Sequence, residues 1–318
     1  MLRTSFLTRT PNPSANVCVV GTGQANAQQL RSLGRSLGLL ALLRGKLVAI
    51  VPGPPLIVGE LLNHAYARAR RAWTEQSDQL YAELAKHQAR LGARYLNVNL
   101  GSTSTFAVDP EDARRRLPRI ISTLQATTTT PLGFDSTDLE LQRIALTHYD
   151  RTRSPAPLLN SIAKTRPHLD AWFALIERFK PKVIVMAADG LMGSETSVNS
   201  TEAALDTCLR FAQELQHAGL TPDDIFFDPG LGVLGHDPLG LIPRSLELLK
   251  KLSEAPELRG THRIVGLSNL TACTPKALRA EAQRAYLEQA LPLGLDCILA
   301  NPETPAARAA QRSFHLRA

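Results

Sequence analysis

Eight short apolar runs, spaced along residues 56–302 with longer amphipathic stretches between them, constrain the fold of this chain more than any other feature. Most are rich in Val, Ile, Leu or Phe, which is typical of strands buried on both faces of a parallel sheet. The runs are LIVG (56–59), YLNVNL (95–100), PLGFDS (131–136), PLLNSI (157–162), KVIVMAA (182–188), DIFFDPG (224–230), HRIVGLS (262–268) and LDCILANP (295–302). Eight strand–helix units over about 260 residues predict a (β/α)8 TIM barrel. An open, doubly wound sheet is the alternative architecture.

The stretches between the runs predict helices. Residues 64–92 predict one long helix. The stretch that follows Ser200 predicts another, with Ser200 as its N-terminal cap and Gly219 at its end. After Pro302 the chain predicts only a short final helix.

Residues 1–55 differ from the rest of the chain, and we predict an irregular N-terminal extension before a barrel domain over residues 56–318. The first 59 residues contain six basic groups and no acidic group, and Pro and Gly punctuate them. Such an acid-poor start is typical of a transit segment or of an added arm.

The net charge of +7 comes almost entirely from this start, because the remaining residues carry 30 basic and 29 acidic groups. Binding of a phosphate backbone requires a basic surface, so we exclude nucleic acid as a partner. No uninterrupted apolar run reaches the roughly 18 residues that a membrane span requires, so we expect no membrane segment. We therefore expect a cytoplasmic protein.

Polar residues gather where the predicted strands end, and in a barrel of this kind the active site lies at those ends. The residues are Asn97, Asn99, Asp135, Asn160, Asp189, Asp228, Ser268, Asn269 and Asn301. Taken singly, each is explained as a helix cap or a turn residue. Together they form a ring of amides and carboxylates without His, Cys or Lys, so we predict neither a metal site nor a Schiff-base lysine. The ring suits a flat heterocycle with adjacent N–H donors, which a carboxylate accepts together.

Several motifs at these strand ends resemble those of a known family. The segments are LIVGELLN (56–63), FDST (134–137), LLNS (158–161), FFDPG (226–230), GLSN (266–269), QRAYL (283–287) and GLDCILANP (294–302). In this order they resemble the pterin-binding (β/α)8 barrels. They are most similar to the methyltetrahydrofolate:corrinoid protein methyltransferases, including the folate domain of cobalamin-dependent methionine synthase. The resemblance covers roughly residues 56–302.

The resemblance implies that Asp135, Asn160 and Asp228 hold the pyrimidine side of the pterin, and that Asn269 bonds near N5 as the catalytic residue. It assigns further substrate contacts to Asn97, Asn99, Ser268 and Arg284, with Asp189 and Asn301 as additional candidates. Tetrahydrofolate or 5-methyltetrahydrofolate would be the substrate. Cobalamin would be carried by a partner corrinoid protein, and the family implies a homodimer.

The chemistry of methyl transfer explains why an Asn would be placed at N5. A methylated N5 is a poor leaving group unless it gains positive character, and a neutral amide can keep its hydrogen bond as the proton arrives. No His or Glu stands among the strand-end residues, so the sequence predicts amide-assisted protonation, with water as a proton source.

Two departures from the family pattern leave alternatives open. Asn97 replaces an Asp of the second-strand motif, and Leu61 replaces an Arg of the first-strand motif. The loop after Asp228 is more similar to that of dihydropteroate synthase, which condenses a pterin pyrophosphate with p-aminobenzoate. Against that alternative, GLSN and ANPE stand where the synthase has cationic elements, and His236 stands in place of a loop Lys. A non-catalytic barrel that binds a pterin or a partner is the third alternative.

Overall fold

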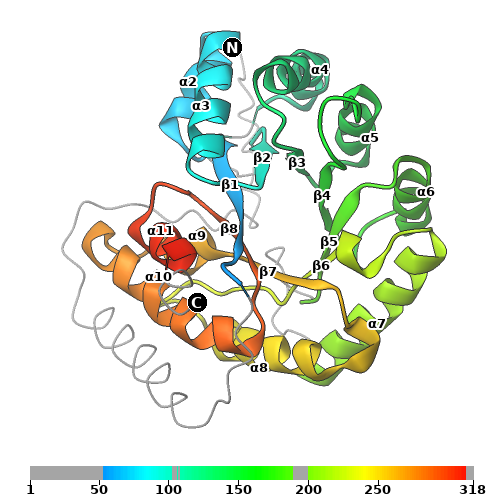
Figure 1. Cartoon of the computed structure of the whole chain (residues 1–318), viewed down its shortest axis with the longest axis vertical. Coiled ribbons are helices and arrows are strands. Elements are labelled where there is room, and N and C mark those ends of the chain that lie inside the picture. The colour runs from blue at the N-terminus through cyan, green and yellow to red at the C-terminus, as the bar shows by residue number, and fades with distance from the viewer. Residues whose placement is uncertain (1–52, 102–105, 107, 189–199, 313–318) are drawn as a thin grey trace, which may run out of the picture.

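Eight parallel strands close into a barrel in the computed structural model, which describes residues 53–101, 106, 108–188 and 200–312 (Figure 1). The strands are β1 (Leu56–Asn63), β2 (Tyr95–Asn99), β3 (Leu132–Asp135), β4 (Leu158–Ile162), β5 (Lys182–Met186), β6 (Ile225–Asp228), β7 (His262–Gly266) and β8 (Cys297–Ala300). Each coincides with a predicted apolar run, which confirms the (β/α)8 barrel. The open-sheet alternative is wrong, because β1 pairs with β8 from Leu56 opposite Cys297 onward.

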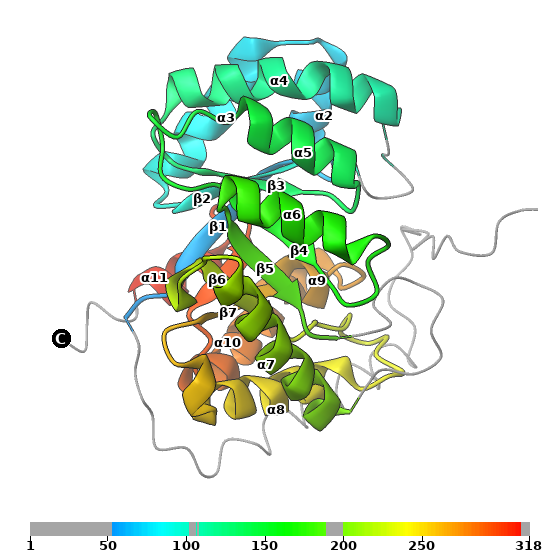
Figure 2. The same ribbon diagram turned by 90° about the vertical axis from the view of Figure 1, so that its right-hand side faces the viewer.

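Helices surround the barrel, and neighbours such as α4 and α5 pack against each other (Figure 2). They are α2 (Ala67–Thr74), α3 (Asp78–Arg90), α4 (Pro110–Thr127), α5 (Leu139–His148), α6 (Leu169–Phe179), α7 (Thr201–His217), α8 (Leu241–Glu254), α9 (Leu267–Leu270), α10 (Lys276–Ala290) and α11 (Pro305–Arg312). Within the described ranges, none of these helices is both long enough and apolar enough to span a bilayer.

The predicted single helix over residues 64–92 is wrong, because the chain breaks it into α2 and α3. Gln76 adopts a φ of 48°, a left-handed conformation that interrupts helical hydrogen bonding. Ser77 then caps α3 by accepting a 3.3 Å hydrogen bond from the backbone N–H of Leu80. A local cap therefore restarts the helix, and the apolar period alone does not reveal the break.

The helix predicted after Ser200 is confirmed as α7. The Ser200 hydroxyl accepts a 3.1 Å hydrogen bond from the backbone N–H of Ala203. Beyond its end, Gly219 has a φ of 85°, which favours glycine. The short final helix is also confirmed, since α11 has eight residues.

Alternation along the strands separates an apolar barrel interior from a polar mouth. Side chains of a barrel strand point inward at every second residue. One buried apolar cluster takes one residue from almost every strand: Val58, Tyr95, Leu158, Ile184, Phe226, Ile264 and Cys297. Two residues further along several of these strands stand Glu60, Asn97, Asn160 and Asp228. The same period that fills the interior therefore brings polar groups to the C-terminal mouth.

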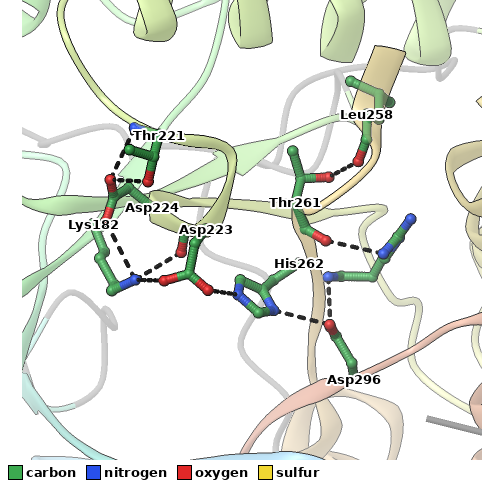
Figure 3. A network of polar contacts seen from close by, with 9 residues as sticks. Lys182, Thr221, Asp223, Asp224, Leu258, Thr261, His262 and Asp296 are labelled. Carbon is green, nitrogen blue, oxygen red and sulfur yellow. Dashed lines mark hydrogen bonds and ion pairs between the residues drawn. The ribbon is translucent and has the colours of Figure 1, made fainter. Parts of the chain in front are cut away.

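The opposite, N-terminal end of the barrel carries a network of charged groups that satisfy one another (Figure 3). His262 lies between two carboxylates, with Nδ1 at 2.9 Å from Asp296 Oδ2 and Nε2 at 3.1 Å from Asp223 Oδ1. Lys182 Nζ donates a 2.5 Å hydrogen bond to Asp223 Oδ2. These residues begin or precede strands β5 to β8, so the network ties four strand starts together. In barrels of this kind, residues at the N-terminal face contribute to stability and not to catalysis.

The predicted N-terminal extension lies outside the described residues, apart from residues 53–55. Its status, and the domain boundary at residue 56, therefore stay predictions.

Candidate functional site at the barrel mouth

Three of the predicted binding residues meet through their side chains. Asn97 on β2 is fully buried, and its Nδ2 donates a 2.9 Å hydrogen bond to Oδ2 of Asp135 on β3. Asn160 on β4 donates from Nδ2 to Oδ1 of Asn97 over 3.4 Å. Because β2, β3 and β4 are adjacent, with Asp135 paired to Asn160 in register, the sheet itself brings the three together.

The carboxylate of Asp135 is the half-exposed member of this group. Burial raises its pKa, while hydrogen bonds from Asn97 and Asn99 and the positive charge of Arg166 lower the pKa in part. The two amides also orient the carboxylate. Asn99 is itself held in place, since its Oδ1 accepts a 3.0 Å hydrogen bond from the backbone N–H of Gly101. Asp135 is thus an oriented acceptor at the edge of the mouth.

Asp228 is a second carboxylate at the mouth, at the end of β6. Its Oδ1 accepts a 2.8 Å hydrogen bond from the backbone N–H of Gly230, whose φ of 77° favours glycine. Burial raises the pKa of Asp228 to about 7, and the Gly230 hydrogen bond offsets this only in part. Within the described ranges Oδ2 accepts no hydrogen bond, so that oxygen remains available to a ligand.

Asn269 lies exposed on the one-turn helix α9, directly after β7. A Cβ on Gly266 would lie 2.8 Å from Asn269 Nδ2, so a glycine at position 266 leaves room for this side chain. Among the described residues, the Asn269 amide forms no side-chain hydrogen bond. An exposed amide without a side-chain partner in the described residues is suited to contact a bound molecule.

Glu60 is a residue of the mouth that the strand-end reading missed. It lies inside β1, is 3% exposed, and accepts a 2.9 Å hydrogen bond from Ser268 Oγ at Oε2. The hydroxyl of Tyr66 donates to Oε1, and the backbone N–H of Asn301 donates as well. The sequence predicts no Glu at the strand ends, and Glu60, which lies inside β1, adds a carboxyl that this prediction did not include.

Burial raises the pKa of Glu60 to about 7, against the three hydrogen bonds, which lower it; the charge of Asp135 raises it further. The sequence already indicates that the Glu60 side chain points into the barrel. Glu60 is the only charged residue of LIVGELLN, and it follows Val58 by two positions. The interior period therefore points it into the barrel.

A cation near the mouth was also missed. Arg166 follows β4 and donates from Nε to the backbone carbonyl of Ser161 at 3.3 Å. Burial lowers the pKa of Arg166, and the charge of Asp135 raises it in part. Arg166 therefore balances some of the negative charge of the mouth.

Two other predicted residues have different side-chain contacts, and a third is not described. Arg284 is exposed on α10, where Nη1 contacts Glu288 Oε1 at 3.3 Å, and it does not join the cluster. The Asn301 side chain accepts a 2.8 Å hydrogen bond from the backbone N–H of Glu303, which is the turn role expected of a single Asn. Asp189 lies outside the described residues.

The departure at position 61 has a packing explanation. Leu61 is fully buried in the core cluster between the barrel and its helices, so its side chain does not reach the mouth.

His236 is exposed on the loop after β6. The described part of the chain contains no group of three or more His, Cys, Asp or Glu residues arranged to hold a metal ion.

Comparison with solved structures finds the same barrel fold in two dihydropteroate synthases. The dihydropteroate synthase of Burkholderia cenocepacia, in complex with 7,8-dihydropteroate, superposes with a TM-score of 0.61 at 20% identity. The match covers 83% of this chain and 91% of that one. The synthase of Stenotrophomonas maltophilia gives a TM-score of 0.59 at 19% identity, over 83% and 92% of the two chains.

A curated relative is similar in sequence. It is the methylcorrinoid:tetrahydrofolate methyltransferase of Eubacterium limosum, 23% identical over 249 residues, which are 78% of this chain and 85% of the relative. The family model described as "Pterin binding enzyme" matches residues 59–298, from the first strand to the last. On that match, the chain belongs to the pterin-binding enzyme family.

Proposed function

We propose that this protein transfers a methyl group between N5 of tetrahydrofolate and the cobalt of a corrinoid protein. The observation that carries the proposal is the meeting of Asp135, Asn97 and Asn160 at the barrel mouth, where Asp228 ends β6 and Asn269 follows β7. The Asn269 amide has no side-chain partner among the described residues. The similarity to a methylcorrinoid:tetrahydrofolate methyltransferase supports the same reaction.

The carboxylates would bind the pyrimidine side of the pterin. A 2-amino-4-oxo-pyrimidine ring presents adjacent N–H and NH2 groups, and the open oxygen of Asp228 is an acceptor for them. Charge-assisted hydrogen bonds of this kind contribute roughly 1.5 to 3 kcal/mol each when shielded from water. Asp135, oriented by two amides, would hold a second edge of the ring.

Asn269 would act at N5. Its amide can hydrogen-bond to N5 whether or not that nitrogen carries a proton, so the bond persists as positive character develops. This interaction is strongest when the methyl group is leaving, which is the condition for lowering the barrier.

The cobalt of the corrinoid accepts or donates the methyl group and belongs to the partner protein. This chain would bind the folate, orient N5 toward the open mouth and manage the proton at N5. Tetrahydrofolate or 5-methyltetrahydrofolate is thus the small substrate, the corrinoid protein is the macromolecular partner, and a homodimer is the assembly we expect from the resemblance.

Dihydropteroate synthesis is less well supported. Its pyrophosphate leaving group requires cations, yet in the described structure the ends of β7 and β8 present Ser268, Asn269 and Asn301, with no Lys or Arg. The likeness to synthase structures concerns the fold. A barrel that binds no ligand would have no need to keep Asp135, Asn160, Asp228 and Asn269 at one mouth, since such groups are costly to bury unless paired.

Anaerobic spectrophotometry tests the proposal. The purified protein is mixed with 5-methyltetrahydrofolate and cob(I)alamin, and in parallel with tetrahydrofolate and methylcobalamin. Enzyme-dependent interconversion of the two cobalamin spectra is expected. Absence of conversion in both mixtures, and with a purified corrinoid protein as acceptor, would overturn the proposal.

A further inference from the structure

Glu60 is a buried carboxyl to which the proposed reaction assigns no role. Its two oxygens are both occupied, Oε1 by the Tyr66 hydroxyl and Oε2 by Ser268 Oγ at 2.9 Å. A carboxyl that is 3% exposed is desolvated, so its position requires a reason beyond packing.

Ser268 connects this buried carboxyl with the open mouth. Ser268 is half-buried, and the next residue, Asn269, is exposed. A hydroxyl both donates and accepts, so it can receive a proton from one side as it releases its own on the other. The hydrogen bond from Ser268 therefore links the buried Glu60 carboxyl to the residue that precedes Asn269.

We propose that Glu60, through the hydroxyl of Ser268, supplies the proton that N5 of the bound folate gains when its methyl group leaves. The inference rests on the proposed function and deepens it. Asn269 cannot supply this proton, because an amide is not an acid at neutral pH, and it keeps the role of stabilising N5.

The proton balance of the step is complete within these groups. When Glu60 is protonated, its O–H donates to Ser268 Oγ, the reverse of the bond in which Ser268 donates to Oε2, and the Ser268 hydroxyl turns toward N5. The Glu60 carboxyl then gives its proton to Ser268 Oγ, and the original Ser268 proton passes to N5. The bond between N5 and the methyl carbon then breaks with its electron pair remaining on N5, and the methyl group passes to the corrinoid. Glu60 is left as a carboxylate. In the reverse direction N5–H returns its proton along the same path.

The surroundings of Glu60 suit a group that both holds and releases a proton. Burial raises the pKa of Glu60 to about 7, and the charge of Asp135 raises it further. The hydrogen bonds from Tyr66, Ser268 and the Asn301 backbone lower the pKa and favour release. Burial raises the pKa of Tyr66 above its ordinary value, and the charge of Glu60 and the hydrogen bond to it raise this pKa further, so Tyr66 remains a donor.

Three substitutions test the relay, with single-turnover methyl transfer from 5-methyltetrahydrofolate to cob(I)alamin followed across the range around pH 7. Glu60→Gln keeps the shape and the acceptor but removes the acid. Ser268→Ala removes the connecting hydroxyl, and Ser268→Thr restores a hydroxyl. Glu247→Gln, which removes an exposed carboxylate on α8, is the matched control. Binding of tetrahydrofolate is measured by calorimetry on each variant.

For the wild-type protein, the transfer rate should fall as pH rises through about 7, because Glu60 loses its proton. Glu60→Gln and Ser268→Ala should each reduce the rate by about 100-fold, which is the lower end of general-acid effects. Both substitutions should also flatten the pH profile. Folate affinity should change much less than the transfer rate. Ser268→Thr should recover the profile, and Glu247→Gln should match the wild type.

Infrared difference spectra provide a readout that does not depend on activity. A protonated-carboxyl band that titrates near neutral pH should be absent in Glu60→Gln and shifted in Ser268→Ala. The relay is overturned if Glu60→Gln keeps the wild-type profile, if Thr at 268 rescues nothing, or if the band disappears in Asp228→Asn instead. A wild-type protein that transfers no methyl group either to cob(I)alamin or to a purified corrinoid protein would end the proposed function, while the infrared spectra would still decide whether Glu60 and Ser268 share a proton.

Discussion

Asn97 donates a 2.9 Å hydrogen bond from its side-chain amide to the carboxylate of Asp135, and it does so while fully buried. The relationship explains why an amide is tolerated at a position where the resembling family often has Asp. A carboxylate there would face a second carboxylate in a desolvated site, whereas the amide supplies the hydrogen that Asp135 accepts. The departure at position 97 is therefore consistent with a functional mouth.

Asn97→Asp should destabilise the protein at neutral and higher pH. Two adjacent carboxylates raise each other's pKa, so the folded state binds more protons than the unfolded state above a pH of about 4. The free energy of unfolding should therefore fall as pH rises, by roughly 1 to 3 kcal/mol at about pH 8, the cost of an unmatched buried polar group. Urea denaturation near pH 5 and pH 8 measures this.

Asn63→Asp is the matched control for that substitution. The Asn63 side chain accepts a 2.8 Å hydrogen bond from the backbone N–H of Ala65, and an Asp accepts the same bond. It should change stability little at either pH. An equal loss in both variants would show that the Asn97–Asp135 contact is not the cause.

Asn269→Ala should slow methyl transfer much more than it weakens folate binding. Removal of a single hydrogen-bonding group that acts on the transition state reduces kcat by roughly 100- to 1000-fold in other enzymes. The exposed Asn269 amide has no side-chain hydrogen bond within the described chain, so its loss should leave the fold intact. Stopped-flow transfer rates and calorimetric affinities decide the matter, and equal losses in both would remove the N5 assignment.

Asp228→Asn should weaken tetrahydrofolate binding and remove its pH dependence. Because burial raises the pKa of Asp228 to about 7, wild-type affinity should increase as pH rises through that value and the carboxylate forms. The loss at about pH 8 should be roughly 10- to 100-fold, from one charge-assisted hydrogen bond. Calorimetry at several pH values measures it, and unchanged affinity would take Asp228 out of the site.

His262→Gln should reduce stability more at low pH than at high pH. Burial lowers the pKa of His262, but the hydrogen bonds and charges of Asp296 and Asp223 outweigh it, so the net pKa is raised. The stabilisation is thus fully present below the unfolded value of about 6.5 and is lost as pH rises through the folded pKa.

For this 19% exposed side chain, a loss of about 1 to 2 kcal/mol near pH 6 is expected, and it should shrink toward pH 8. Urea denaturation measures the free energy of unfolding of this variant and of the control His236→Gln, which replaces an exposed loop histidine. A loss that grows with pH would contradict the role of the network.

Deletion of residues 1–50 should leave a cooperatively melting barrel. The first strand begins at Leu56 and pairs with Cys297 of β8 from its first residue, so the deletion removes no strand of the described barrel. Calorimetric melting of the shortened and full chains is the measurement. Loss of a cooperative transition would show that the N-terminal segment belongs to the core.

The sequence by itself determined the order and type of the main elements, because these depend on local patterns. Apolar runs of four to eight residues defined all eight strands, and Ser200 with Gly219 fixed the limits of α7. The strand-end amides and carboxylates were also visible, since the period of a strand carries them two residues beyond the interior layer.

Only the tertiary structure decided which of these groups meet. Glu60 and Ser268 are 208 residues apart, and their hydrogen bond exists because β1 closes the barrel beside β8, next to β7. Arg284 belongs to the QRAYL motif, yet it lies on the exposed side of α10, where it contacts Glu288. Contacts of this range depend on barrel closure and helix rotation, which no local pattern of residues encodes.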